Sequence, residues 1–489
     1  NRRSLMLAGG GGGILALGGL ALSGRIPLGG KSLLGNGIAV LPFRNLTGDA
    51  NNEFIAAGLS SELRSRLARN AALKVVARSS IEAITEQSLS PQDIAKRFGV
   101  THVFDGDIRL SGSDIKVTAE LIDGKTGFNS WTKEFQHSPD DILALQNEIS
   151  NAVTQSLTQR VSQDTDDSRN GGTDNPQAYN EYLRGTDLFR SSQGRASAQK
   201  ALEHFDHAVK LDPNFAAVHA ARARLLLWFG GISAESTLAR DYFDAAIMAA
   251  EKAVALSPNL ADAHSTLGYV LFSAKLNKSE ARIPFEKSRE LGFGSSPILA
   301  RYATYMAVTG HDADATTAIT RALELDPLNA TIHDTAALVH YAARRFAAAI
   351  TATQRVLDMN SRQFNARARI GLSMIYSGEI ETGIEVCDSE ANQMERLPCL
   401  AIGRYKQGQP ESAKAAMAEL IEKFGDAGAY QQAQVLAQGA QPDAAMETLL
   451  KAESLSDSGL TLALIDPALD PLREREDFGQ LLARLGLSG

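Results

Sequence analysis

Apolar residues recur with different periods along the first third of the chain. Residues 52–69 place apolar side chains at the three- and four-residue intervals of a helix, whereas residues 114–123 place them at every second position. The second pattern is typical of a strand with one buried face and one solvated face. Short apolar runs at 37–43 and 73–77 are typical of buried strands. Together these segments predict a compact α/β domain over residues 37–161 with a mixed sheet.

Local signals complete the predicted elements of this domain. Ser90 precedes Pro91, an N-cap and first-turn pair that predicts a helix start. Strands are expected at 101–110 and 128–136 on either side of the alternating segment, because serine- and glycine-containing turns separate the three. A helix over residues 140–161 is expected to close the domain.

The remaining two thirds of the chain are periodic in a different way. Residues 162–175 are polar and contain glycine, which predicts a linker, and residues 176–489 follow a helical pattern throughout. A short sequence motif recurs five times in this region, and the last residues of successive copies are 45, 35, 34 and 34 residues apart. We call the copies of this motif rungs: AVKLDP (208–213), AVALSP (253–258), SRELGF (288–293), ALELDP (322–327) and VLDMNS (356–361).

The rungs resemble tetratricopeptide repeats, in which paired antiparallel helices of about 34 residues stack into a superhelix. Small and large residues fall at the family's fixed offsets: Tyr302-Ala303, Gly310, Ala315, Ala322, Ile370-Gly371, Gly378, Gly383 and Cys387. Gly378, Gly408 and Gly439 are expected to end first helices. We expect roughly eight hairpins, an extra loop at 230–237 that explains the longest spacing, and a polar-faced capping helix at 468–486.

The smaller domain carries a second resemblance. IAVLPFRNLTGDANNEFIAAGLSSEL, VVARSS, GVTHVFDGDIRLSGSDIKVTAELIDGKTGFNSWTKEF and DILALQNEIS are similar to the TolB-N-terminal-like or FlgO-like periplasmic domain. That resemblance implies an architecture found in CadC-like winged-helix regulators and in membrane-bound class III adenylate or guanylate cyclases. In such proteins a DNA-binding or cyclase output domain precedes the membrane span. These residues contain neither output domain, so the resemblance assigns neither activity to them.

Two interpretations of the first 36 residues remain open. Residues 4–24 lack charge and are long enough to cross a bilayer as a helix, and residues 25–36 would form a tether. An uncleaved anchor would place the chain in a bacterial inner membrane as a single-pass protein, with the residues after about 25 in the periplasm. Arg2-Arg3 before a mild apolar run also resembles a twin-arginine export signal, with Ala21-Leu22-Ser23 as a cleavage site. The protein would then be soluble in the periplasm.

Composition narrows the candidate chemistry. The net charge is −8, which provides no global attraction to nucleic acid. Phosphate-loop, G-x-S-x-G and H-E-x-x-H motifs are missing from the sequence, so we expect no enzyme activity, cofactor or metal within these residues. His204 and His207 share a helix face and are expected to be solvated rather than to bind metal. Cys387 and Cys399 form either a disulfide or two separate buried thiols.

Binding is therefore the function that the sequence favours. Tetratricopeptide superhelices use the concave wall made by the first helix of each pair, and mixed aromatic and acidic positions on such a wall suit an extended peptide or protein segment. The register places eight residues there: Asp262, Tyr269, Phe272, Thr304, Asp334, Tyr341, Asn365 and Tyr376. We expect either the extracytoplasmic sensing region of a single-pass signalling protein or an exported envelope scaffold. A homodimer is also compatible with the sequence.

Overall fold

The computed structural model describes residues 37–487 apart from short segments at 50–51, 71–72, 86, 112–113, 139–140, 158–170, 192–193, 234–235 and 276–277. The predicted anchor or signal at 4–24 lies outside the described residues, as does most of the predicted linker. In the described part, no helix is both long enough and apolar enough to cross a bilayer.

The first domain is built on a mixed sheet, as the sequence predicted, and its strands run in the order β3-β1-β4-β5-β6, with β2 also paired to β4. The strand bounds are β1 Gly37–Val40, β2 Arg44–Asn45, β3 Lys74–Val75, β4 His102–Ser111, β5 Asp114–Asp123 and β6 Asn129–His137. Strand β1 pairs in parallel with β3 and β4, while β4, β5 and β6 form an antiparallel meander. Alternate residues of β5 are buried, as its pattern predicted.

Four helices cover the two faces of this sheet: α1 Glu53–Arg69, α2 Arg78–Thr85, α3 Pro91–Phe98 and α4 Ile142–Leu157. Ile38 and Val40 of β1 belong to the core that includes α1 and α4, whereas Ala39 belongs to the core formed with α2 and α3. Strand β1 is consequently buried on both faces, which explains its continuous apolar run. Ser90 caps α3 by accepting a hydrogen bond from the Asp93 amide (3.2 Å), so this predicted helix start is observed.

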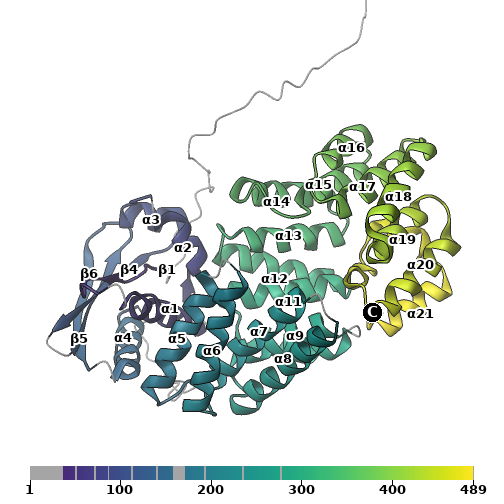
Figure 1. Cartoon of the computed structure of the whole chain (residues 1–489). Coiled ribbons are helices and arrows are strands. Elements are labelled where there is room, and N and C mark those ends of the chain that lie inside the picture. Colours follow the sequence, from purple (N-terminus) through teal and green to yellow (C-terminus); the bar gives the residue numbers. More distant parts are fainter. Residues whose placement is uncertain are drawn as a thin grey trace, which may run out of the picture.

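Helix pairs form the rest of the described chain (Figure 1). The pairs are α5 Pro176–Ser191 with α6 Arg195–Leu211, α7 Ala216–Ile232 with α8 Ser236–Leu256, α9 Ala261–Ala274 with α10 Arg282–Leu291, α11 Ser296–Val308 with α12 Asp312–Leu325, α13 Ala330–Ala342 with α14 Phe346–Met359, α15 Ala366–Ser377 with α16 Ile380–Asp388, α17 Gln393–Lys406 with α18 Pro410–Phe424, and α19 Ala429–Gln438 with α20 Pro442–Ser454. Short 3₁₀ segments lie at η4 Ser279–Ala281, η5 Gly425–Gly428, η6 Ser458–Leu462 and η7 Pro467–Leu472, before the last helix, α21 Glu476–Arg484.

Small residues let the paired helices approach closely. A Cβ on Gly383 would lie 2.7 Å from the Gly371 carbonyl oxygen, so only glycine fits between α15 and α16 at this point. Gly310, Gly378 and Gly408 adopt positive φ where first helices end, as expected for residues that reverse the chain. At the end of α19, Ala440 rather than Gly439 takes the left-handed conformation (φ 56°).

Two predictions about length were wrong. The interval between the rungs at 208–213 and 253–258 is longer than the others, and an extra loop was predicted at 230–237. Most of the extra residues belong instead to helices α7 and α8, which are 17 and 21 residues long. The single capping helix predicted at 468–486 is also interrupted. Proline occurs at positions 467 and 471, and the segment is a 3₁₀ stretch, η7, followed by the shorter α21.

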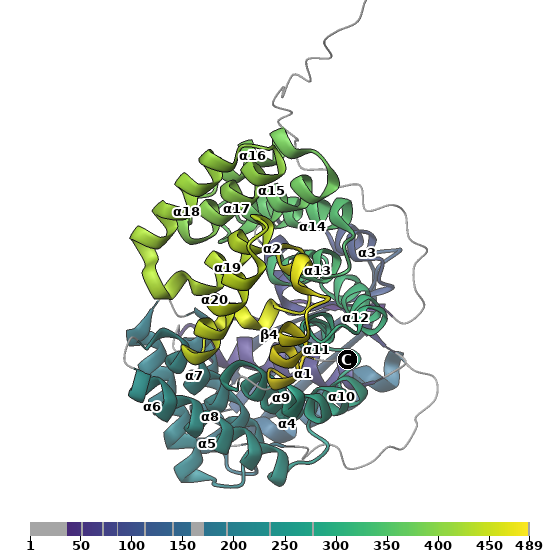
Figure 2. The same ribbon diagram turned by 90° about the vertical axis from the view of Figure 1, so that its right-hand side faces the viewer.

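The array is curved, and the end of α21 contacts the segment between α9 and α10. Figure 2 shows the C-terminal helices lying across the array. The Lys278 amide donates to the Leu485 carbonyl oxygen (2.9 Å), which joins the last turn of the chain to the segment after α9. The small domain lies against the start of the array, where α1 contacts α5 (Figure 1).

Candidate functional site

The first helices of the array line its inner, concave wall. First helices of successive pairs contact one another: α7 with α9, α9 with α11, α11 with α13, α15 with α17, and α17 with α19. Second helices do not form a comparable row among the described residues. A wall whose neighbouring helices are closest together is the one on the inside of the curve, so the inner surface is built from first-helix side chains.

Charged side chains connect three of the first helices in this wall, α7, α9 and α11. Arg224 on α7 pairs with Asp262 on α9 through Nη1 and Oδ2 at 2.6 Å, and the same guanidinium donates to the Thr266 hydroxyl at 2.9 Å. Arg301 on α11 donates to the Ser265 hydroxyl (3.1 Å) and stacks over the ring of Tyr269 at 5.5 Å. Charge and aromatic surface therefore alternate along α7, α9 and α11.

The ionisation of Asp262 shows how strongly these cations act. Desolvation opposes its charge, but the positive charges of Arg224 and Arg301 outweigh that effect and hold the pKa of Asp262 below its ordinary value. The side chain of Asp262 nevertheless remains 42% exposed and that of Tyr269 39% exposed. This part of the wall is ionised and also reachable from solvent.

The second half of the wall is more enclosed. Asp334 on α13 pairs with Arg369 on α15 at 2.6 Å, and Tyr376 stacks on Phe346 with ring centroids 5.7 Å apart. Phe346 also contacts Tyr341 edge-on at 5.9 Å. Burial raises the pKa values of Tyr341 and Tyr376 well above 10, so both phenols stay neutral at every physiological pH.

The chain's own C-terminal segment covers this half. We call residues 458–472 the return segment. Arg344, next to α13, donates to the Ile465 carbonyl and pairs with Asp470 at 2.7 Å. Asp466 accepts hydrogen bonds from Tyr430 (2.8 Å) and from Gln434, and burial raises its pKa. Tyr341 and Tyr376 thus face a surface that the protein already fills.

The eight residues predicted for the wall divide into groups. Asp262, Tyr269 and Asp334 take part in the inter-helix contacts described above, and Tyr341 and Tyr376 lie together around Phe346. Phe272 is only 9% exposed and packs against Phe285 and Tyr305, within the helix core.

Thr304 and Asn365 make local hydrogen bonds. The Thr304 hydroxyl donates to the Ala300 carbonyl at 3.1 Å, one turn back on its own helix. Asn365 precedes α15 with φ 61° and accepts from the Asn392 amide group at 2.8 Å, which links the starts of two successive first helices. Both side chains therefore shape the backbone of the wall.

The arginines of the wall were not predicted from the sequence. Arg301 and Arg369 each stand eight residues after the last residue of a rung, and this shared position is a signal that could have identified them. Their contacts with the preceding first helix, of Arg301 with Ser265 and of Arg369 with Asp334, were not visible, because the partners lie 35 or more residues away.

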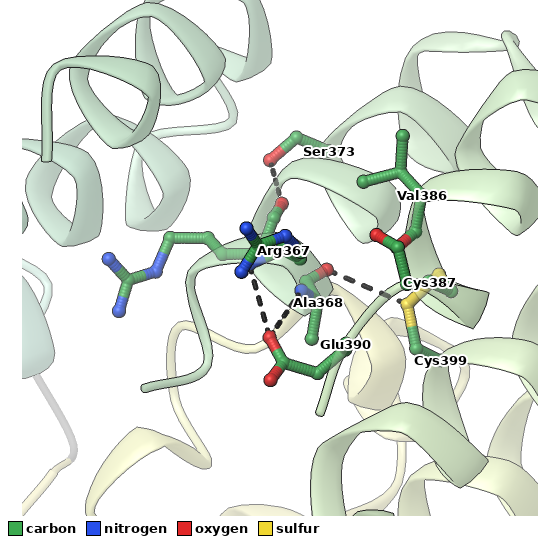
Figure 3. Close-up of a disulfide and its surroundings, with 9 residues drawn as sticks. Arg367, Ala368, Ser373, Val386, Cys387, Glu390 and Cys399 are labelled. Atoms are coloured by element: carbon green, nitrogen blue, oxygen red, sulfur yellow. Dashed lines mark hydrogen bonds between the residues drawn. A yellow bond between two sulfur atoms is a disulfide. The ribbon is translucent and has the colours of Figure 1, made fainter. Parts of the chain in front are cut away.

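Two other features of the sequence can now be placed. His204 and His207 both approach Glu181, with Nδ1 to Oε2 distances of 2.6 and 3.5 Å, and the described residues contain no group of three or more potential metal ligands. Cys387 on α16 and Cys399 on α17 form a disulfide, with Cα atoms 5.7 Å apart (Figure 3).

Comparisons with known proteins extend this description. No protein-family model matches the chain. Putative adenylate cyclase 3 of Rhizobium meliloti is 27% identical over 191 residues, which make up 39% of this chain and 32% of that protein. The chain therefore corresponds to only about a third of that relative's length.

Similar solved structures are helical-repeat proteins. The human IFIT1 dimer with m7Gppp-AAAA has a TM-score of 0.40 and 11% identity, covering 64% of this chain and 77% of that one. A tetratricopeptide repeat protein from Parabacteroides merdae has a TM-score of 0.38 and 15% identity (54% and 99%), and PilF of Pseudomonas aeruginosa has 0.33 and 15% (42% and 93%). The chain itself is a mixed-sheet domain followed by a helical array of tetratricopeptide type, as its own helix pairs show.

Proposed function

We propose that this chain is a protein-binding scaffold whose open binding surface is the first half of the concave wall. The observation that carries the proposal is the row formed by Arg224, Asp262 and Arg301 with Tyr269, which is ionised and solvent-reachable, whereas the return segment contacts the other half of the wall. Alternating charge with a rigid aromatic ring suits an extended polypeptide carrying its own charged side chains. The partner is a protein segment rather than a small apolar molecule.

We further propose that the scaffold is the extracytoplasmic sensing region of a single-pass bacterial signalling protein. Support comes from the resemblance of residues 37–160 to a periplasmic domain and from the partial similarity to a protein named a putative adenylate cyclase. The disulfide between Cys387 and Cys399 suits an oxidising compartment. In this proposal an output domain, winged-helix or cyclase, lies upstream, and residues 37–489 have no catalytic activity of their own.

The binding surface is tested by charge reversal. Arg301→Glu would repel the neighbouring Asp262 and any acidic partner segment, so a partner cross-linked to the wild-type protein is expected to be lost. Arg362→Glu, on an exposed turn outside the wall, is the matched control and should retain that partner. Circular dichroism checks that both variants fold. Equal recovery of the same partner by both variants would refute a role for this wall.

The signalling role is tested separately. The coding sequence upstream of Asn1 is expected to contain a winged-helix or cyclase domain, whereas a start codon within a few residues would favour an exported envelope scaffold instead. Purified residues 37–489 are expected to produce no cyclic nucleotide from ATP or GTP. Turnover by this fragment would overturn the assignment of catalysis to another domain.

A further inference from the structure

A separate hollow lies between the small domain and the helical array. Its volume is about 1560 Å³, and it reaches from the end of β3 to Asp262 at the start of the concave wall. One side is formed by α1 and by residues 75–79, which follow β3. The other side is formed by residues 171–175, which precede α5, and by turns between successive helix pairs, including residues 291–298.

The position of this hollow relative to the sheet is informative. Strands β1 and β3 are parallel neighbours. The hollow lies at the carboxyl end of β3, where Val75 lines it, and its residue Arg64 donates to the carbonyl of Val40, the last residue of β1. In open α/β sheets ligands bind beyond the carboxyl ends of the parallel strands. The α/β domain therefore contributes the edge of its sheet that is best suited to a ligand.

Arg64 on α1 is the residue that points to the ligand's charge. Arg64 lines the hollow and is only 7% exposed, with one Nη2 hydrogen bond to the Val40 carbonyl (2.8 Å). Its Nε has no hydrogen-bond partner, and no carboxylate of the described residues forms an ion pair with it. A buried guanidinium without a counter-charge is costly, and a bound anion would remove that cost.

A second guanidinium increases the positive charge on the same side. Arg78 also lines the hollow, and its charge lies close enough to lower the pKa of Arg64 further, to about 10, beyond the larger effect of burial. Arg78 pairs with Glu82 at 2.5 Å, so only one carboxylate accompanies these two cations. Repulsion between them is relieved when a ligand places negative charge between them.

The acidic residues of the hollow do not neutralise Arg64. Glu62 pairs with Arg66 at 3.4 Å, and Asp262 pairs with Arg224. Asp326 accepts from Ser79 and Ser80, so its oxygens are engaged in joining the two domains. Asp212 accepts from Thr173 and from the Asn214 amide, and Asp174 forms no ion pair with Arg64 or Arg78. No carboxylate that lines the hollow is therefore paired with Arg64.

We propose that this hollow binds a small organic oxyanion, with Arg64 and Arg78 holding its phosphate or carboxylate group. Guanidinium groups match both oxyanions through paired N–H donors. The volume exceeds the 300–1,000 Å³ of common ligand pockets, so the hollow has room for an organic body beside the anionic group.

Calorimetric titration of the full chain at low ionic strength tests this site. The probes are glucose 6-phosphate, citrate, inorganic phosphate and uncharged glucose. At least one of the two organic anions is expected to bind, and more tightly than inorganic phosphate, while glucose is expected not to bind. A preference for glucose 6-phosphate identifies a phosphoryl ligand, and a preference for citrate identifies a carboxylate ligand.

Variants locate the binding. Arg78→Gln is expected to lower the affinity about tenfold, as loss of a charge-assisted hydrogen bond does. Arg64→Met removes the buried charge and should abolish binding, whereas Arg362→Gln on an exposed turn leaves the affinity unchanged. Should Arg64→Met fail to fold, Arg78→Gln decides alone. Absence of binding by both organic anions, or unchanged affinity in Arg78→Gln, would overturn the proposal. The outcome does not depend on the partner proposed for the concave wall.

Discussion

Three histidines repeat a single contact along the array. Each stands six residues after a rung proline and directs Nε2 at that proline's carbonyl oxygen: His219 to Pro213 (2.9 Å), His264 to Pro258 (2.7 Å) and His333 to Pro327 (2.9 Å). The contact links each turn to the first helix that follows it. The constant six-residue offset from the rung proline is present in the sequence, although its meaning becomes clear only from the shared acceptor.

These histidines predict a dependence of stability on pH. Burial lowers the pKa values of His219 and His333 below their ordinary value. The unfolded chain therefore binds more protons near pH 6, and the stability contributed by the neutral rings is lost as the pH falls below about 6.5. Replacing both residues with glutamine, which keeps a donor, should flatten the decline of the free energy of unfolding between about pH 7 and pH 5.

Urea denaturation at a series of pH values measures this effect. His207→Gln is the control, because His207 lies on the surface with its side chain 58% exposed. An unchanged slope in the double variant would show that other groups dominate the titration.

The glycine pair between α15 and α16 gives a second residue-level prediction. Gly383→Val places side-chain atoms against the Gly371 carbonyl, which a Cβ would already approach to 2.7 Å. We expect a loss of about 1–3 kcal/mol in the free energy of unfolding, typical of overpacking. Gly479→Ala is the matched control, since a Cβ there meets nothing within 4 Å. A thermal melt of Gly383→Val like that of the wild type would contradict the close approach.

At the scale of elements, α15, α16 and α17 are joined by more than stacking. Glu390 follows α16 and accepts from the amides of Arg367 and Ala368 at the start of α15, at 3.1 and 3.2 Å (Figure 3). Its second oxygen accepts from the Asn392 amide at 3.0 Å, just before α17. One buried carboxylate thus caps two helix starts, beside the disulfide that bridges α16 and α17.

The disulfide predicts a redox effect on this part of the array. Cys387 and Cys399 are 12 residues apart, and closing a loop of this size stabilises a fold by about 2–3 kcal/mol through restriction of the unfolded chain. Reduction, or the double change Cys387→Ala and Cys399→Ala, should lower the denaturation midpoint accordingly. Thiol titration of the unreduced, denatured protein should find no free thiol, and two free thiols would refute the bridge.

The whole molecule depends on how the two domains meet. Asp326, in the rung 322–327, accepts from Ser80 at 2.6 Å and also from Ser79 at the start of α2, while the Ala77 amide donates to the Leu325 carbonyl at 2.9 Å. Close contact elsewhere leaves no room for a side chain, since a Cβ on Gly294 would lie 2.1 Å from the Ala68 carbonyl. A turn between repeats therefore doubles as the docking surface for the small domain.

Asp326→Ala tests this docking. It leaves Ser79 and Ser80 without their acceptor, which should cost about 1–3 kcal/mol at the interface. Hydrogen exchange of the α2 amides is expected to accelerate, while exchange in α15 stays unchanged. Asp358→Ala, on an exposed stretch of α14, serves as the control. Unaltered exchange in α2 would show that the other contacts suffice to hold the domains together.

The sequence by itself determined the class of fold, because amphipathic periods and small-residue positions are local properties. The alternation in 114–123, the N-cap at Ser90 and the close-approach glycines of α15 and α16 could all be recognised from neighbouring residues. The return segment, the Asp326 docking contact and the unpaired Arg64 were decided by tertiary structure alone. Each of these features depends on a contact between residues far apart in the chain, and such contacts produce no periodic pattern in the sequence.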